Sequence, residues 1–223
     1  VHRLLRALQL GGLVEQNLEN GKYRLSLEIL QLAGMVLRRM DDLQQIARPF
    51  LKALAEACEE TVNLTILAGD GVINIDRIPS PHRVRNIGWV GRRMPLHCVS
   101  AGKVFLAFMP NSEANRFLSQ TLPQLTPYTI TDADQLREQL RQVREQGYGV
   151  GLEELEEGLN AVAAPIRDYR GEVVAAISVS GPSFRLTREK IPEVAELTKR
   201  AADEISRQLG YIPEQQPLLS ITE

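Results

Sequence analysis

The first 25 residues of the chain predict an amphipathic helix followed directly by a β-hairpin. The apolar side of the helix is formed by Val1, Leu4, Leu5 and Leu8. The basic residues Arg3 and Arg6 lie on its other side. Asn20-Gly21 is a strong hairpin-turn signal, and the alternating segment 22–25 follows it. This order of elements is typical of the recognition helix and wing that end a winged-helix domain.

This segment also carries residue types that bind nucleic acid. A recognition helix enters the major groove and a basic wing contacts phosphates, so the predicted DNA contacts are His2, Arg3, Arg6, Lys22 and Arg24. The alternative is an ordinary helix and hairpin, because Glu15 and Glu19 weaken the basic patch. A helix-turn-helix needs a preceding helix, and the predicted recognition helix begins at residue 1. We therefore expect this DNA-binding domain to be incomplete.

Composition limits the remaining possibilities. The 223 residues, 43% of them hydrophobic, suffice for one well-cored domain and a smaller appendage. No segment approaches the roughly 18 uninterrupted apolar residues of a membrane span, and no signal peptide is seen. Two cysteines do not form a disulfide scaffold. The net charge of -2 gives no general attraction to nucleic acid, so DNA affinity must be local. We expect a cytoplasmic protein that does not contact membranes.

Two helices are expected after the hairpin. The first begins at Ser26, and its apolar residues, which extend to Met40, cover more than one face. This predicts a linker helix that packs on its own domain and on a second subunit, with a buried core helix as the alternative. Asp41 and Asp42 begin the second helix, whose apolar residues keep a helical period as far as Cys58.

The rest of the chain predicts an antiparallel sheet covered by helices. Alternating or β-branched segments place strands at 62–66, 72–78, 83–90, 159–166 and 172–180. Helices are expected at 104–108, 113–118, 131–146 and 187–209. The last two strands are expected to form the central hairpin of the sheet. The fold class is therefore α+β, in the manner of a small sensor domain.

Six short motifs, in the same order along the chain, closely resemble those of the IclR family of bacterial transcription regulators. They lie at residues 1–8, 23–25, 94–103, 153–158, 163–166 and 177–182. The resemblance implies a winged helix-turn-helix DNA-binding domain, a dimerising linker helix and a GAF-like effector-binding domain. It assigns 1–26 to the C-terminal part of the first, 27–40 to the linker and 41–212 to the effector-binding domain, and leaves 213–223 as a C-terminal tail.

The resemblance also implies a site for a small effector, often a carboxylate. The implied residues are Met94, Ser100, Ala101, Gly102, Gly151, Leu159, Ala161, Ser178 and Ser180. Their chemistry agrees, because residues 100–102 open a predicted helix whose free N–H groups favour an anion. Ser178 and Ser180 share one strand face and offer hydroxyls, and Met94 and Leu159 could form apolar walls. Alternatively, the small residues and serines only permit close packing.

Two positions depart from the family pattern. Gly151 stands where many relatives have an acidic residue, and Cys98 stands where they have a small one. Cys98 beside His97 permits a second hypothesis, a cytosolic GAF-like enzyme that uses Cys98 as a redox or nucleophilic thiol. The competing interpretation is a packing cysteine and a histidine that hydrogen-bonds a loop.

Other chemical signals are weaker. The three histidines, His2, His82 and His97, lack metal-ligand spacing, so we expect neither a metal nor a cofactor. The glycine-rich segment 147–151 follows a helix and is interpreted as a helix stop and strand entry. The glutamates at 153, 154, 156 and 157 are expected to form a solvated face, because nothing apolar nearby would raise a pKa as paired catalytic carboxylates require.

The sequence therefore predicts a ligand-responsive transcription regulator, not an enzyme. Its expected partners are operator DNA, a small organic-acid effector and a second copy of itself, with dimer and dimer of dimers both left open. A dimerisation module without a ligand is the third hypothesis.

Overall fold

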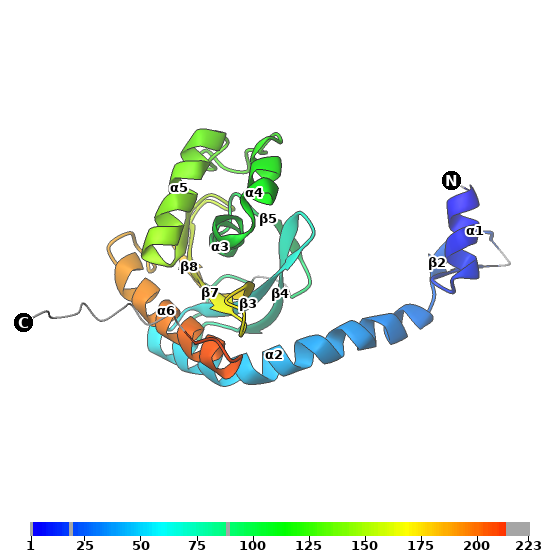
Figure 1. The fold of residues 1–223 in the computed structure, drawn as a ribbon, viewed down its shortest axis with the longest axis horizontal. Helices are drawn as coiled ribbons and strands as arrows, with labels where there is room; N and C mark the ends of the chain where they lie inside the picture. Colours follow the sequence, from blue (N-terminus) through cyan, green and yellow to red (C-terminus); the bar gives the residue numbers. More distant parts are fainter. Residues whose placement is uncertain (1, 18–19, 88–89, 213–223) are drawn as a thin grey trace, which may run out of the picture. The chain divides into compact units, whose positions relative to one another are not determined.

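The computed structural model describes residues 2–17, 20–87 and 90–212 (Figure 1). Side chains are described over the same residues, except at His2 and at positions 30–41. Val1, Glu19, the expected tail 213–223 and the side chains of most of the expected linker helix lie outside this description. The chain divides into two compact units, Val1–Gln45 and Ile46–Glu223.

The first unit contains the predicted helix and hairpin. Helix α1 spans His2–Leu10, and strands β1 (Val14–Gln16) and β2 (Tyr23–Leu25) pair antiparallel. The turn between them includes Gly21, whose φ of 66° is costly for other residues. The backbone N–H of Leu13 donates to the carbonyl of Leu8 at 2.9 Å, which ties the start of the hairpin to the end of α1.

Helix α2 is continuous from Glu28 to Cys58, so the predicted new start at Asp41-Asp42 is wrong. Aspartate is only mildly unfavourable inside a helix, and the apolar period continues on both sides of the pair. The helix also accommodates Pro49. Ser26 stabilises the start of α2, because its hydroxyl accepts a hydrogen bond from the N–H of Glu28 at 3.1 Å.

Within the described part of the second unit, six strands form one antiparallel sheet in the order β5-β4-β3-β8-β7-β6. Their bounds are β3 Thr61–Ala68, β4 Gly71–Ile78, β5 Arg93–Pro95, β6 Gly149–Leu152, β7 Leu159–Arg167 and β8 Val173–Pro182. The predicted hairpin of two long strands is formed by β7 and β8. The centre of the sheet is the β3–β8 pair, not that hairpin.

The strand expected at 83–90 is not formed by its described residues, 83–87 and 90. Side chains hold this segment as a loop. Arg85 donates to the carbonyls of Ser80 and His82, and the Thr61 hydroxyl donates to the carbonyl of Asn86 at 3.2 Å. The edge strand β5 lies later in the chain, where Met94 pairs with Val72 of β4.

Helices cover both faces of the sheet, which confirms the α+β class (Figure 1). Helices α3 (Ser100–Phe108), α4 (Asn111–Leu118) and α5 (Ala133–Gln146) lie on one side, and α6 (Ile191–Gln208) lies on the other with the end of α2. Helix α5 has the expected stop, since Gly147 caps it with a φ of 81°. Strand β6 follows two residues later, as the glycine-rich segment predicted.

Helix α3 packs directly against the backbone of the segment that precedes it. A Cβ atom at Gly102 would lie 2.6 Å from the Cα of Leu96 and nearer still to its carbonyl oxygen. Neither backbone atom can move aside cheaply. A Cβ at Gly151 of β6 would be 3.3 Å from the backbone nitrogen of Ser100, which is tight but tolerable.

We therefore expect Gly102→Ala to destabilise the protein by about 3 kcal/mol, because overpacking a close contact forces the backbone apart. Urea denaturation followed by circular dichroism would measure the loss. Gly151→Ala is the matched control, with a clearly smaller expected loss. Equal losses from the two substitutions would contradict this account of α3.

Candidate functional site

The sheet face below α3 carries a group of buried polar side chains, which we name the polar floor. Its members are Thr61, Asn63, Thr65, Asn74, Ser178 and Ser180, none of them more than 6% exposed. Register pairs Thr61 with Ser180, Asn63 with Ser178 and Thr65 with Asn74, so each pair points to one face. Ser178 also pairs with Ala163, which belongs to the apolar cluster around α3. The polar floor therefore faces α3.

Several residues implied by the family resemblance lie in one row of this face. Gly151 of β6 pairs with Ala161 of β7, and Ala161 pairs with Ser180 of β8. The close approach of Gly151 to the backbone nitrogen of Ser100 brings the row against the first turn of α3. Helix α3 thus starts over one end of the row, and the polar floor lies at the other.

The remaining residues implied by the resemblance lie on several different elements. Ala101 and Gly102 lie in the first turn of α3, and Leu159 is half-buried at the start of β7. Met94 lies on β5, at the opposite edge of the sheet from Gly151, where it packs against the apolar cluster around α3. Met94 and Gly151 thus belong to the two edge strands of the sheet, and both lie close to the chain around the start of α3.

The first turn of α3 has free donors. Its N-cap residue, Val99, is extended and supplies no side-chain hydrogen bond. The N–H of Lys103 donates to the carbonyl of Val99 at 3.0 Å, so the N–H groups of residues 100–102 precede the helical ladder. Such groups and the helix dipole together favour an anion.

The two serines of the predicted site have different surroundings. The Ser180 hydroxyl oxygen accepts hydrogen bonds from the side-chain amides of Asn63 at 3.3 Å and Asn86 at 2.9 Å, and its proton faces the Thr61 carbonyl at 3.5 Å. Ser180 thus helps to hold the 80–86 loop on the sheet. The Ser178 hydroxyl has no hydrogen-bond partner among the described residues.

Thr61, Asn63, Thr65 and Asn74 were not among the site residues predicted from the sequence. A signal was present, because β3 alternates polar Thr61, Asn63 and Thr65 with apolar Val62 and Leu64. That pattern usually indicates one solvated face. Here both faces are buried, and the polar side chains bond to one another, as Thr65 does to Asn74 at 2.8 Å.

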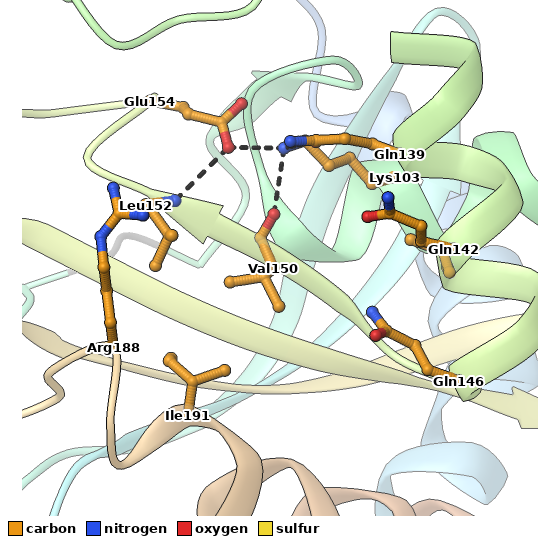
Figure 2. A pocket seen from close by; sticks show the side chains of 10 residues that line it. Lys103, Gln139, Gln142, Gln146, Val150, Leu152, Glu154, Arg188 and Ile191 are labelled. Carbon is orange, nitrogen blue, oxygen red and sulfur yellow. Dashed lines mark hydrogen bonds and ion pairs between the residues drawn. The ribbon is translucent and has the colours of Figure 1, made fainter. Parts of the chain in front are cut away.

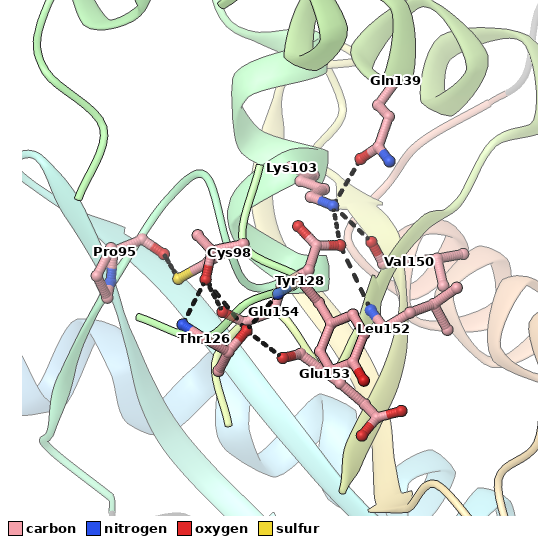
Figure 3. A network of polar contacts seen from close by, with 11 residues as sticks. Pro95, Cys98, Lys103, Thr126, Tyr128, Gln139, Val150, Leu152, Glu153 and Glu154 are labelled. Carbon is pink, nitrogen blue, oxygen red and sulfur yellow. Dashed lines mark hydrogen bonds and ion pairs between the residues drawn. The ribbon is translucent and has the colours of Figure 1, made fainter. Parts of the chain in front are cut away.

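A buried ion pair ties α3 to the elements around it (Figure 3). The ammonium of Lys103, fully buried, donates to the carboxylate of Glu154 at 2.5 Å, to the Gln139 side chain at 2.6 Å and to the Val150 carbonyl at 3.0 Å. Burial lowers the pKa of Lys103, and the charge of Glu154 opposes that shift. The pair joins α3, α5 and the turn after β6.

The prediction of a solvated face at 153–157 is therefore wrong for Glu154, which is only 5% exposed. Its partner, Lys103, is far away in sequence, which is why local polarity misled the prediction. The Thr126 and Thr129 hydroxyls hold the same turn, since they donate to the carbonyls of Glu153 and Glu154, each at 2.7 Å. Glu156 and Glu157 are exposed, as expected.

A pocket of about 280 Å³ lies beside this ion pair (Figure 2). Its walls include the glutamine side chains 139, 142 and 146 of α5, together with Leu152 and Arg188. None of the residues implied by the family resemblance lines it. The pocket and the polar floor are therefore separate features of the second unit.

Cys98 has the environment of a packing residue. It is 1% exposed, and burial, followed by the nearby charge of Glu154, raises the pKa of its thiol to about 12. A protonated, enclosed thiol is a poor nucleophile at neutral pH. His97 is also buried, and its Nε2 is 2.9 Å from the carbonyl of Pro123, the loop contact that the sequence predicted.

The predicted DNA-contacting residues share the first unit. Arg3 and Arg6 are exposed on α1, and Lys22 is exposed just before β2. Arg24 is 69% exposed at its side chain, but its guanidinium pairs with Glu15 at 2.8 Å, which reduces its net charge contribution. His2 opens α1, and its side chain lies outside the description. The described residues contain no metal-binding group of three or more ligands and no helix that could cross a membrane.

Comparison with known proteins gives matches over most of the chain. The family model for the C-terminal part of the bacterial transcriptional regulator IclR matches residues 35–207. The HTH-type transcriptional regulator KdgR of Escherichia coli K12 is 36% identical over 212 residues, which cover 95% of this chain and 80% of KdgR.

Solved structures agree with these matches. The crystal structure of Thermotoga maritima IclR has a TM-score of 0.75 and 32% identity, with 94% of this chain and 85% of that chain covered. An IclR homologue from Microbacterium hydrocarbonoxydans, complexed with 4-hydroxybenzoate, has a TM-score of 0.72 and 29% identity, with 93% and 84% covered.

Removal of one member of the buried ion pair is expected to leave a buried, uncompensated charge. Lys103→Met should therefore lower the free energy of unfolding by about 3–5 kcal/mol, and the double variant Lys103→Met/Glu154→Gln should recover part of the loss. Urea denaturation would measure both. Arg141→Ala, which breaks an exposed pair with Glu138, is the control and should leave the midpoint unchanged. A double variant less stable than the single one would refute this role of the pair.

Proposed function

This chain belongs to the IclR family of bacterial transcriptional regulators, and we propose from that premise that it is a DNA-binding regulator switched by a small carboxylate bound between α3 and the polar floor. The observation that carries the proposal is the free N-terminal turn of α3 over a sheet face with buried hydroxyl and amide groups. Because a regulator acts on the chromosome, we propose that it works in the bacterial cytoplasm.

The electrostatics of this region favour an anion. Residues 100–102 present backbone N–H groups, and Ser178 has a hydroxyl without a partner among the described residues. Gly151 provides no carboxylate where many relatives have an acidic residue, so nothing at that position repels a negative ligand. The 4-hydroxybenzoate of the Microbacterium relative is itself a carboxylate, and it supports the same class of effector here.

We propose the domain organisation that the sequence predicted: residues 1–26 as the C-terminal part of the DNA-binding domain, 27–40 as the linker, 41–212 as the effector-binding domain and 213–223 as a tail. Two subunits pair through the N-terminal region and present two recognition helices, and such dimers can pair again through the effector-binding domains. The effector changes DNA binding only if it binds the DNA-competent and incompetent arrangements with different affinity.

The enzyme hypothesis depended on Cys98, and the surroundings of Cys98 do not suit a reactive thiol. Cys98 is enclosed, and the raised pKa of about 12 keeps its thiol protonated at neutral pH. The relatives of this chain are named transcriptional regulators. The protein is a regulator and not an enzyme.

The exposed arginines of α1 provide the first test. Arg3→Ala and Arg6→Ala should weaken binding to a DNA fragment from upstream of the protein's own gene. Each lost phosphate contact should reduce the slope of log affinity against log salt by about 0.9. Fluorescence anisotropy of the native protein at several salt concentrations would measure this. Arg137→Ala, on α5 of the other unit, should bind as the wild type does; arginine variants of α1 with wild-type affinity and slope would refute the DNA-binding proposal.

The serines provide the second test, a thermal-shift screen against carboxylates. A ligand at 100 times its Kd adds about 2.7 kcal/mol to stability, so an effector should raise the Tm by several degrees. Ser178→Ala should reduce this shift and leave the Tm of the free protein nearly unchanged. Ser180→Ala should lower the Tm of the free protein, because two side-chain amides lose their acceptor. If no carboxylate raises the Tm, the effector class is wrong.

A further inference from the structure

One acceptor of the polar floor lacks a partner. The side-chain oxygen Oδ1 of Asn63 is buried and has no hydrogen bond among the described residues. Its side-chain nitrogen donates to Ser180, whose own proton faces the Thr61 carbonyl. In this arrangement the Ser180 oxygen accepts from the Asn63 amide nitrogen, and Oδ1 of Asn63 is the atom without a partner.

A free buried acceptor is unfavourable unless a donor from a ligand or an ordered water satisfies it. Leaving a buried polar atom unpaired costs about 1–3 kcal/mol, and most such atoms in proteins are paired. We infer, on the basis of the proposed function, that the effector carries a hydroxyl group near its carboxylate and that this hydroxyl donates to Asn63. Ser178 and Asn63 are direct partners across β8 and β3, so their Cβ atoms lie roughly 5 Å apart. A carboxylate at Ser178 thus places its second or third carbon beside Asn63.

The chemistry of the floor selects a hydroxyl among possible donors. A carboxylate alone has no proton to give, so it cannot satisfy Oδ1. An ammonium group would need a compensating negative charge, and the polar floor consists of neutral hydroxyls and amides. The next pair, Thr65 and Asn74, is also neutral and polar. A hydroxy acid supplies both the carboxylate and an uncharged donor, which makes Asn63 the specificity-determining residue of this inference.

Matched pairs of acids test this assignment by titration calorimetry of the native protein. The pairs are propanoate with lactate and butanoate with 3-hydroxybutanoate, supplemented by 2-methoxypropanoate and alanine. At least one hydroxy acid should bind at least tenfold more tightly than its deoxy partner, because a site built for a hydroxyl rejects the analogue that lacks it. The methoxy acid keeps the oxygen but lacks the proton, so it should bind as weakly as propanoate. Tighter binding of alanine than of lactate would overturn the choice of a hydroxyl.

Asn160 provides a matched protein control. It is buried like Asn63, its Oδ1 also lacks a partner among the described residues, and its amide donates to the Leu186 carbonyl. It alternates with Ala161 on β7 and so points to the opposite face of the sheet. Asn63→Ala should abolish the preference for the hydroxy acid, and Asn160→Ala should preserve it.

The outcomes separate this inference from the proposed function. Equal binding of hydroxy and deoxy acids would overturn the hydroxyl assignment and leave the carboxylate effector standing. A preference that persists in Asn63→Ala would overturn the role of Asn63. If none of these acids nor any other carboxylate binds, the effector proposal fails and this inference fails with it. The comparison of the methoxy and hydroxy acids needs no variant, so it decides the donor question even if Asn63→Ala does not fold.

Discussion

The ion pair between Lys103 and Glu154 holds the helix on which the candidate site depends. Lys103 lies one residue after the free first turn of α3, and its ammonium is fixed by groups from α5, β6 and the following turn. The residue before it, Gly102, allows α3 to approach the backbone of Leu96. The ion pair thus opposes rotation of α3, and the absence of a side chain at Gly102 sets how closely α3 packs on Leu96. Both contacts help to set the direction of its N–H groups.

The polar floor buries polar groups at a free-energy cost, and that cost needs an explanation. The same sheet face packs Val72, Ala163 and Ala176 against the apolar cluster around α3. Apolar residues could have covered the whole face and would have avoided the penalty for burying amides and hydroxyls. Sequences that break a packing rule locally often do so at a functional site. The free oxygen of Asn63 and the unpartnered hydroxyl of Ser178 are what such a site should show before its ligand arrives.

Local signals predicted much of the fold. The Asn20-Gly21 hairpin, the Gly147 helix stop and the β7–β8 hairpin each depend on turn chemistry or on periodicity within a few residues. Two of the wrong predictions depended on distant partners: Thr61 and Ser180 hold 80–86 as a loop, and Lys103 removes Glu154 from solvent. The family resemblance supplied Gly151, Ala161 and Ser180, which the sheet aligns. It did not supply Asn63, because polar alternation alone cannot show that both faces of β3 are covered.

The same alternation explains how a ligand could act beyond its own site. Asn63 belongs to the polar floor on one face of β3. Its neighbours Val62 and Leu64 point to the other face, which α6 and the end of α2 cover. Only Glu59 and Glu60 separate α2 from β3, and both are held: Ser80 donates to the Glu59 carbonyl at 2.7 Å, and Arg185 pairs with Glu60 at 2.6 Å. A junction this short and held at both residues has little chain in which a displacement of β3 could be absorbed before it reached α2. Because α2 begins in the unit that carries the exposed arginines, β3 and α2 connect the proposed effector site along the chain to the proposed DNA-contacting residues.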